Sequence, residues 1–236
     1  MTPQTDPRPV ALVTGGSQGL GLVLVRALAA RGWHVITDAR DAVRLDGAVG
    51  DLENVTPVGG DVADPRHRAA LAAAVDSLGR LDLLVNNAST LGASPLPHLS
   101  DHAVDALEHV YAVNTIAPLA LLQLVLPALR RSGGRVVNVS SDAAVEAYEG
   151  WGAYGSAKAA LDHATAVLAV ENPDLRVYAI DPGDMRTEMH QRAFPGDDIS
   201  DRPLPDDVLV PFLRLVDGDE PSGRYRAAEL APVAAR

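Results

Sequence analysis

The sequence predicts an α/β fold in which a doubly wound, mainly parallel sheet carries helices on both faces. Short apolar runs alternate with longer amphipathic segments along most of the 236 residues, which is the pattern of repeated strand–helix units. A glycine-rich turn separates the first strand from the first helix, as in nucleotide-binding sheets. The length suits a single domain over residues 1–236 with a substantial core.

The first unit runs from an apolar strand at Val10 to Thr14 into an amphipathic helix that stops at Gly32. The glycines between them open the backbone to a ligand, and the start of the helix offers free N–H groups and a positive dipole end. An ordinary tight turn can show a similar pattern, but we expect a dinucleotide site. Its predicted contacts are Gly15, Ser17, Gln18, Gly19, Leu20 and Gly21.

The later elements continue the alternation. The helix expected over 64–79 has Asp64 as its N-cap, Pro65 in its first turn and Gly79 at its stop. Residues 188–207, rich in proline, aspartate and glycine, predict an irregular segment. The other expected elements are strands at 33–37, 54–59, 81–88, 134–141 and 175–181, a helical region over 100–129 and a helix from 153 to about 171.

Tyr154 and Lys158 stand four residues apart on the last of these helices, so their side chains share one face. A phenol beside a cation suits proton transfer at a carbonyl or an alcohol, because the cation favours the phenolate and lowers the tyrosine pKa. An isolated pair of this kind usually covers only surface. Lys158 is, however, the only lysine in the chain, and Ser141 ends the strand just before this helix.

These features follow the order of the short-chain dehydrogenase/reductase family, which the chain resembles from about residue 10 to about residue 226. Thr14 and the glycines after it are similar to the family signature T-G-x-x-x-G-x-G, and Ser141 has the spacing from Tyr154 of the family's catalytic serine. The resemblance implies a Rossmann fold. Further matching positions are Asn86-Asn87-Ala88, Asn114, Asp181-Pro182-Gly183 and Thr187.

The resemblance also implies roles for these positions. Tyr154 would be the general acid/base, Ser141 would hold the substrate oxygen, and Lys158 would bind the nicotinamide ribose and lower the Tyr154 pKa. Asn114 would hold a water that connects Lys158 to solvent, although a satisfied core amide is the usual interpretation of such an asparagine. The remaining implied cofactor contacts are Asp61, Val62, Asn87, Ala88, Pro182, Gly183 and Thr187.

The chain departs from the family pattern at three positions. Ser89 stands where a glycine is usual, and Asp181 replaces an asparagine, which leaves the local hydrogen bonds open. Gln18 stands where many NADP-dependent members carry a basic residue. The roles of these three side chains therefore cannot be transferred directly from the family.

The choice of cofactor depends on the end of the second strand. Arg40 falls where NADP-dependent relatives place an arginine that pairs with the 2′-phosphate, and Ala39 falls at the acidic position of NAD-dependent ones. Asp38 lies one residue earlier, so a shift of one residue would reverse the conclusion. We expect NADP(H) to be favoured, with NAD(H) as the alternative and with Asp38 and Arg40 among the contacts.

Composition restricts the partners. The chain has no cysteine, which excludes disulfides and thiolate metal sites, and no metal site is expected. A formal net charge of −11 argues against nucleic acid or an anionic membrane as a partner. The N-terminal MTPQTDPRP lacks the features of a signal peptide, and the apolar run at 117–129 is too short to span a bilayer. We expect a soluble cytoplasmic protein.

The sequence thus predicts an NADP-dependent oxidoreductase for a small carbonyl or alcohol substrate. The alternatives are an NAD-dependent alcohol dehydrogenase and a catalytically silent dinucleotide-binding sensor or scaffold. A homo-oligomer, dimer or tetramer, is expected through helices matching 100–131 and 153–171. The candidate side chains around the substrate are Glu146, Tyr148, Glu149, Trp151, Met185, Met189 and Phe194, although solvated loop charges are the more usual interpretation of the two glutamates.

Overall fold

The structure is a computed structural model that describes residues 8–230. Residues 1–7, on which most of the expectation about a signal peptide rests, and residues 231–236 lie outside the described part of the chain. A seven-stranded sheet has the order β3-β2-β1-β4-β5-β6-β7, and each neighbouring pair is parallel. The strands are β1 Val10–Val13, β2 His34–Ala39, β3 Val55–Gly59, β4 Leu83–Asn86, β5 Arg135–Val139, β6 Arg176–Asp181 and β7 Gly223–Arg226.

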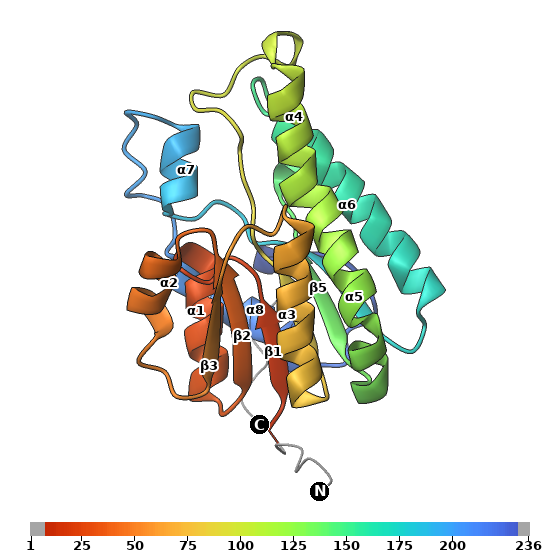
Figure 1. The fold of residues 1–236 in the computed structure, drawn as a ribbon. Coiled ribbons are helices and arrows are strands. Elements are labelled where there is room, and N and C mark those ends of the chain that lie inside the picture. Colours follow the sequence, from red (N-terminus) through yellow and green to blue (C-terminus); the bar gives the residue numbers. More distant parts are fainter. Residues whose placement is uncertain (1–7, 231–236) are drawn as a thin grey trace, which may run out of the picture.

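Helices cover both faces of the sheet (Figure 1). One apolar core packs α1, α2 and α8 against one face, and a second core packs α3 and α5 against the other. The predicted doubly wound α/β fold is therefore confirmed. The helices are α1 Gly19–Ala30, α2 Ala42–Val49, α3 Pro65–Leu78, α4 Val104–Tyr111, α5 Ala117–Ser132, α6 Gly152–Glu171, α7 Glu188–Ala193 and α8 Leu209–Asp217.

The strand order reverses beside β1. The chain proceeds outward from β1 to β2 and β3, then returns to the other side of β1 with β4. The helices that follow these strands on the two sides leave a crevice beyond the carboxyl ends of β1 and β4, where open α/β sheets bind their ligands. The glycine turn, Asn87 and Ala88 all lie at this point.

The caps of α3 agree with the sequence prediction. The Asp64 carboxylate accepts a hydrogen bond from the Arg66 backbone N–H at 2.8 Å, and Pro65 occupies the first turn. Gly79 ends the helix with a φ of 74°, a left-handed conformation that a side chain would disfavour. Local chemistry alone is therefore sufficient to place both ends of this helix.

The helical region predicted over 100–129 begins and ends later than expected. It runs without a break from Val104 to Ser132, and a π-helical turn at Ala112–Ile116 joins α4 to α5. By length and composition alone this 29-residue helix is long and apolar enough to cross a membrane, whereas the expectation concerned only the shorter run at 117–129 within it. In the fold, 56% of its most apolar window is buried.

The segment over 188–207 is not wholly irregular. It contains α7, whose first turn is capped by Thr187: the threonine hydroxyl accepts a hydrogen bond from the His190 N–H at 3.2 Å. A 3-10 turn at Pro205–Val208 then leads into α8. In the view of Figure 1, α7 lies above the carboxyl ends of the strands.

Candidate active site

A cavity of about 1320 Å³ opens at the carboxyl ends of the strands. Its volume exceeds the roughly 300–1,000 Å³ of most small-molecule sites, so it has room for a dinucleotide and a second small molecule. The structure brings the sequence-predicted cofactor contacts together around this cavity. They are Gly15, Ser17, Gln18, Gly19, Leu20, Gly21, Asp38, Arg40, Asp61, Val62, Asn87, Ala88, Tyr154, Lys158, Pro182, Gly183 and Thr187.

The glycine turn is held tightly against its neighbours. The Thr14 hydroxyl accepts hydrogen bonds from the N–H groups of Asn87 and Ala88, both at 3.0 Å, and the Asn87 amide donates to the Thr14 carbonyl at 2.8 Å. A side chain at Gly21 would collide with the Gly15 carbonyl. The turn and the start of α1 thus form a bare backbone surface that fits a pyrophosphate.

Gln18 stands in the same turn, where the sequence departs from the family's basic residue. Its side-chain oxygen is buried and has no hydrogen-bond partner among residues 8–230. Because an unpaired buried acceptor is costly, this amide is a reasonable contact for a ligand in the cavity.

Asp38 is buried, and both of its carboxylate oxygens contact other residues of the protein. One carboxylate oxygen accepts a hydrogen bond from the Gly15 N–H at 2.8 Å, and the other lies 2.9 Å from Nε2 of His67. Only 1% of the residue is exposed. The carboxylate therefore braces the glycine turn, whereas Arg40, at the edge of the cavity, is exposed.

Arg44 is a cavity residue that the sequence analysis missed. It lies on α2, a helix that was not predicted, although Asp41 is a good N-cap and accepts a hydrogen bond from the Arg44 N–H at 2.9 Å. The Arg44 guanidinium pairs with Glu188 at 3.0 Å. This contact connects α2 to α7 across the mouth of the cavity.

Tyr154 and Lys158 face the cavity from the first two turns of α6. Both are buried, and the Lys158 ammonium donates a hydrogen bond to the Val139 carbonyl at 2.7 Å. The Lys158 nitrogen lies 5.6 Å from the centre of the Tyr154 ring. Ser141, just beyond β5, lines the same part of the cavity.

Burial controls the protonation of this pair. It raises the pKa of Tyr154 to about 12, while hydrogen bonds with Ser89 and Ser141 act in the opposite direction. Burial also lowers the pKa of Lys158 to about 8. The expected lowering of the Tyr154 pKa by Lys158 is thus wrong for this structure, because loss of hydration outweighs the other influences on the phenol.

Asn114 does not line the cavity but contacts residues that do. It is fully buried in the π-helical turn, where its carbonyl oxygen accepts hydrogen bonds from the Ser89 hydroxyl at 3.0 Å and the Thr90 N–H at 2.9 Å. Its amide donates to the Thr90 carbonyl at 2.8 Å. Since Ser89 also interacts with Tyr154, the serine that replaces the family glycine connects Asn114 to the phenol.

Asp142 is a second residue that was not anticipated. It accepts a hydrogen bond from the Ser141 hydroxyl at 2.9 Å and another from the Tyr148 hydroxyl at 3.0 Å. It lines the cavity beside Ser141. Glu146 and Glu149 are exposed and neither is part of the cavity wall, which agrees with their interpretation as solvated loop charges rather than as substrate contacts.

The wall beyond Tyr154 is largely apolar. The Trp151 ring meets the Tyr154 ring edge-on with their centres 5.6 Å apart, and the Phe194 ring lies 6.1 Å from Trp151. Leu91, Ala143 and Met189 belong to the same apolar cluster, and Met185 also lines the cavity. Within residues 8–230, no group of three or more His, Asp and Glu side chains is arranged to hold a metal ion.

Comparison with known proteins gives a consistent result. Residues 9–198 match the model of the family described as short chain dehydrogenase. L-xylulose reductase of Bos taurus is 37% identical over 188 residues, covering 78% of this chain and 75% of the relative. Benzil reductase ((S)-benzoin forming) of Saccharomyces cerevisiae is 33% identical over 199 residues, covering 77% of this chain and 73% of the relative.

Solved structures agree in fold. A short chain dehydrogenase of Shigella flexneri, solved in complex with NADP, superimposes with a TM-score of 0.83 at 29% identity. The superposition covers 93% of this chain and 97% of the solved one.

Proposed function

Because this chain belongs to the short-chain dehydrogenase/reductase family of oxidoreductases, we propose that it is an NADP-dependent reductase that converts a carbonyl compound to an alcohol. The observation that carries this proposal is the convergence of Ser141, Tyr154 and Lys158 on the cavity that the glycine turn also lines. One side of the cavity fits a dinucleotide, and the other presents a proton donor to a small substrate.

Each residue of the site has a separate role in the proposed reaction. When bound, a reduced nicotinamide supplies the hydride. Tyr154 donates its proton to the carbonyl oxygen. The Ser141 hydroxyl, which donates to Asp142 in the structure, turns its hydrogen to hold that oxygen by a hydrogen bond. Lys158 binds the nicotinamide ribose. The hydrogen bond between Asn114 and Ser89 orients the Ser89 hydroxyl beside the Tyr154 phenol. Oxidation of an alcohol would use the same groups in reverse.

The pKa of Tyr154 supports the reducing direction. With a pKa raised to about 12, the phenol keeps its proton at neutral pH and is ready to donate it. Oxidation requires the phenolate, which burial disfavours. We therefore infer that the resting site is protonated for the reducing half of the reaction at neutral pH.

The positions of Asp38 and Arg40 support NADP over NAD. Asp38 is held by Gly15 and His67, whereas Arg40 is exposed at the cavity edge, where its guanidinium suits a phosphate. Gly15, Ser17, Gly19 and Gly21 would hold the pyrophosphate. The NADP complex of the related Shigella flexneri protein is consistent with this preference.

The apolar wall supports a bulky, apolar carbonyl as substrate. Trp151, Met189 and Phe194 offer contact area but few hydrogen-bond partners, so an aromatic ketone such as benzil fits this end better than a polyhydroxylated ketone such as L-xylulose. The two relatives named for these substrates provide the two compounds for the test.

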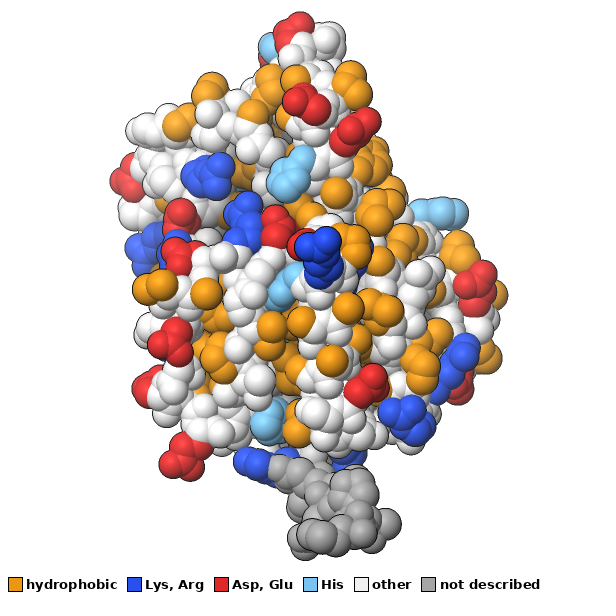
Figure 2. Space-filling view, in the orientation of Figure 1, with side chains coloured by type: hydrophobic (Ala, Val, Ile, Leu, Met, Phe, Trp, Pro, Cys, Tyr) orange, Lys and Arg blue, Asp and Glu red, His pale blue; other side chains and the backbone are white. Residues whose placement is uncertain are grey.

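We also propose that the chain acts as one cytoplasmic domain that forms a homo-oligomer through α4, α5 and α6. Figure 2 shows hydrophobic side chains gathered over the α4 and α5 side of the molecule. Val104, Ile116 and Leu124 are about half exposed or more there, as is Val170 on α6. Sedimentation analysis of the purified chain tests this assembly; a monomer at all concentrations would contradict it.

The activity is tested with the variant Tyr154→Phe, which removes the proton donor and keeps the ring. We expect wild-type protein to oxidise NADPH with benzil, and Tyr154→Phe to lose about 10²-fold or more of kcat with nearly unchanged NADPH binding. NADPH absorbance at steady state and a fluorescence titration measure the two quantities.

Tyr225→Phe is the matched control, because Tyr225 lies on β7, is not part of the cavity wall, and its hydroxyl donates to the Pro221 carbonyl. It should keep the wild-type rate. A Tyr154→Phe variant that turns over at the normal rate would remove Tyr154 from the mechanism, and wild-type protein that reduces L-xylulose much faster than benzil would contradict the proposed substrate class.

A further inference from the structure

Asp181, which replaces the usual family asparagine, has two arginine partners on the next strand. β6 and β7 are parallel, and Ala179 pairs with Arg224 while Asp181 pairs with Arg226. Residues two apart on a strand project from the same face, so both arginines point to the side of the sheet on which Asp181 lies. The Asp181 carboxylate is 3.6 Å from Arg224 and 3.8 Å from Arg226.

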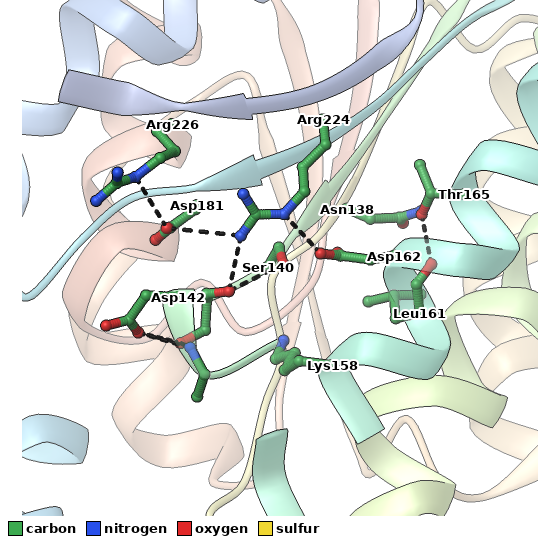
Figure 3. Close-up of polar contacts among 12 residues, drawn as sticks. Asn138, Ser140, Asp142, Lys158, Leu161, Asp162, Thr165, Asp181, Arg224 and Arg226 are labelled. Atoms are coloured by element: carbon green, nitrogen blue, oxygen red, sulfur yellow. Dashed lines mark hydrogen bonds and ion pairs between the residues drawn. The ribbon is translucent and has the colours of Figure 1, made fainter. Parts of the chain in front are cut away.

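The two arginines differ in what else they contact. Arg226 is 59% exposed, and its other ion pair, with Glu229 at 3.6 Å, lies outside the cavity. Arg224 is 27% exposed and donates two shorter hydrogen bonds, one to the Asp162 carboxylate at 2.8 Å and one to the Ser141 backbone carbonyl at 2.9 Å. Figure 3 shows Arg224 between Asp181 and Asp162.

These contacts join the two segments that carry the candidate catalytic groups. Asp162 lies one helical turn after Lys158 on α6, and its side chain is largely buried. Its second oxygen is buried with no hydrogen-bond partner in the described part of the chain, so its carboxylate depends on Arg224. Ser141 belongs to the separate turn after β5. A single guanidinium therefore fixes this turn relative to the helix of Tyr154 and Lys158.

We propose that Arg224 is a positioning residue that sets the Ser141 hydroxyl against Tyr154, and that Asp181 holds Arg224 in place from β6. This inference rests on the proposed function. The guanidinium suits the task because its planar fork can donate to a carboxylate and a carbonyl at once, whereas an ammonium lacks that geometry. No contact of Arg224 with the substrate or the cofactor is implied.

The test compares Arg224→Gln with the matched control Arg226→Gln in NADPH-dependent reduction of benzil. We expect Arg224→Gln to lower kcat roughly 10- to 100-fold, because a misplaced Ser141 and Tyr154 lose their alignment, with Kd for NADPH within about twofold of wild type. Arg226→Gln should leave both quantities unchanged. Arg224→Lys should recover only part of kcat, because it keeps a cation without the fork.

Arg224→Gln leaves the largely buried Asp162 carboxylate without its arginine partner and leaves Asp181 with Arg226, and the variant can fail to fold for that reason. The triple variant Arg224→Gln, Asp162→Asn, Asp181→Asn removes the charges together, and it should show the same loss of kcat with a native circular dichroism spectrum. A kcat within about twofold of wild type in the folded variant, while Tyr154→Phe is inactive, would overturn the role of Arg224 and leave the proposed function standing. Wild-type protein that reduces no carbonyl with either cofactor would instead overturn the proposed function and this role with it.

Discussion

At the scale of single residues, burial decides the chemistry of the candidate site. Tyr154 and Lys158 are 8% and 2% exposed, and loss of hydration moves their pKa values in opposite directions, each toward the neutral form. A neutral phenol is a suitable proton donor for carbonyl reduction. The buried ammonium, in contrast, costs folding free energy, which is the pattern expected when a side chain serves function at the expense of stability.

Replacing the buried ammonium should therefore stabilise the fold. A pKa of about 8 for Lys158, against 10.5 for the free side chain, corresponds to about 3 kcal/mol of destabilisation below pH 8. We expect Lys158→Met to raise the free energy of unfolding at pH 7 by about 2 kcal/mol, after about 1 kcal/mol is lost with the hydrogen bond to Val139, and to abolish reduction. Urea denaturation measures the first effect.

The pH dependence gives a second check. Between pH 8 and 10.5 the unfolded chain holds the Lys158 proton and the folded chain does not, so wild-type stability should rise with pH in this window and the advantage of Lys158→Met should shrink. Leu161→Met, a buried neighbour on α6, serves as the control and should cost less than about 1.5 kcal/mol. A Lys158→Met variant that is less stable than wild type at pH 7 would contradict this account.

At the scale of elements, the glycine turn and α1 act as one unit. Gly15 and Gly19 have positive φ values of 74° and 55°, and Gly21 has no room for a side chain beside the Gly15 carbonyl and the Asn87 amide. Asp38 and Thr14 tie the same turn to β2 and β4. The backbone surface for a phosphate therefore depends on packing between three strands.

Gly21→Ala should disrupt this unit. The new methyl group meets a backbone atom that cannot move without opening the turn, so we expect a loss of about 1–3 kcal/mol in stability and about tenfold or more in NADPH affinity. Thermal denaturation and a fluorescence titration measure the two effects.

Gly47→Ala is the matched control. Gly47 lies within α2, and a methyl group there has no atom within 4 Å. It should stabilise the protein by about 0.5–1 kcal/mol because alanine favours the helix. If Gly21→Ala and Gly47→Ala had the same stability and the same NADPH affinity, the turn would tolerate a side chain.

At the scale of the whole molecule, the candidate site is assembled from segments that are far apart in the chain. The glycine turn precedes α1, Ser141 follows β5, Tyr154 lies on α6, and Arg224 reaches the site from β7. A parallel sheet brings these positions together because the carboxyl ends of its strands share one edge. A ligand that contacts several of them should stabilise the entire fold.

NADPH should therefore raise the melting temperature of the protein. At a concentration 100 times its Kd, binding contributes about 2.7 kcal/mol, which is a rise of roughly 5–10 °C for a chain of this size. NADH at the same concentration should give a smaller shift, and Arg40→Ala should remove the difference. Equal shifts with wild-type protein would contradict the role of Arg40, and no shift with either nucleotide would contradict a dinucleotide site.

The sequence by itself determined the features that depend on neighbouring residues or on a repeated pattern. The alternation of strands and helices, the caps of α3 and the glycine turn depend on neighbouring residues, so they could be predicted one segment at a time. The pairing of Tyr154 with Lys158 also follows from helical spacing alone. Family resemblance added Ser141 and Asn114. Both lie far from the glycine turn along the chain, so their sequence positions alone do not show which residues they contact.

Tertiary structure decided whatever depends on burial or on partners distant in the chain. Asp38, the alternative ribose contact of the sequence analysis, lines the cavity but already contacts Gly15 and His67, and Glu146 and Glu149 are exposed and not part of the cavity wall. The pKa directions at Tyr154 and Lys158 follow from their removal from water, which composition does not report. The arginine partner of Ser141, 83 residues away, becomes visible only when β7 joins the sheet, because parallel pairing brings distant residues into contact.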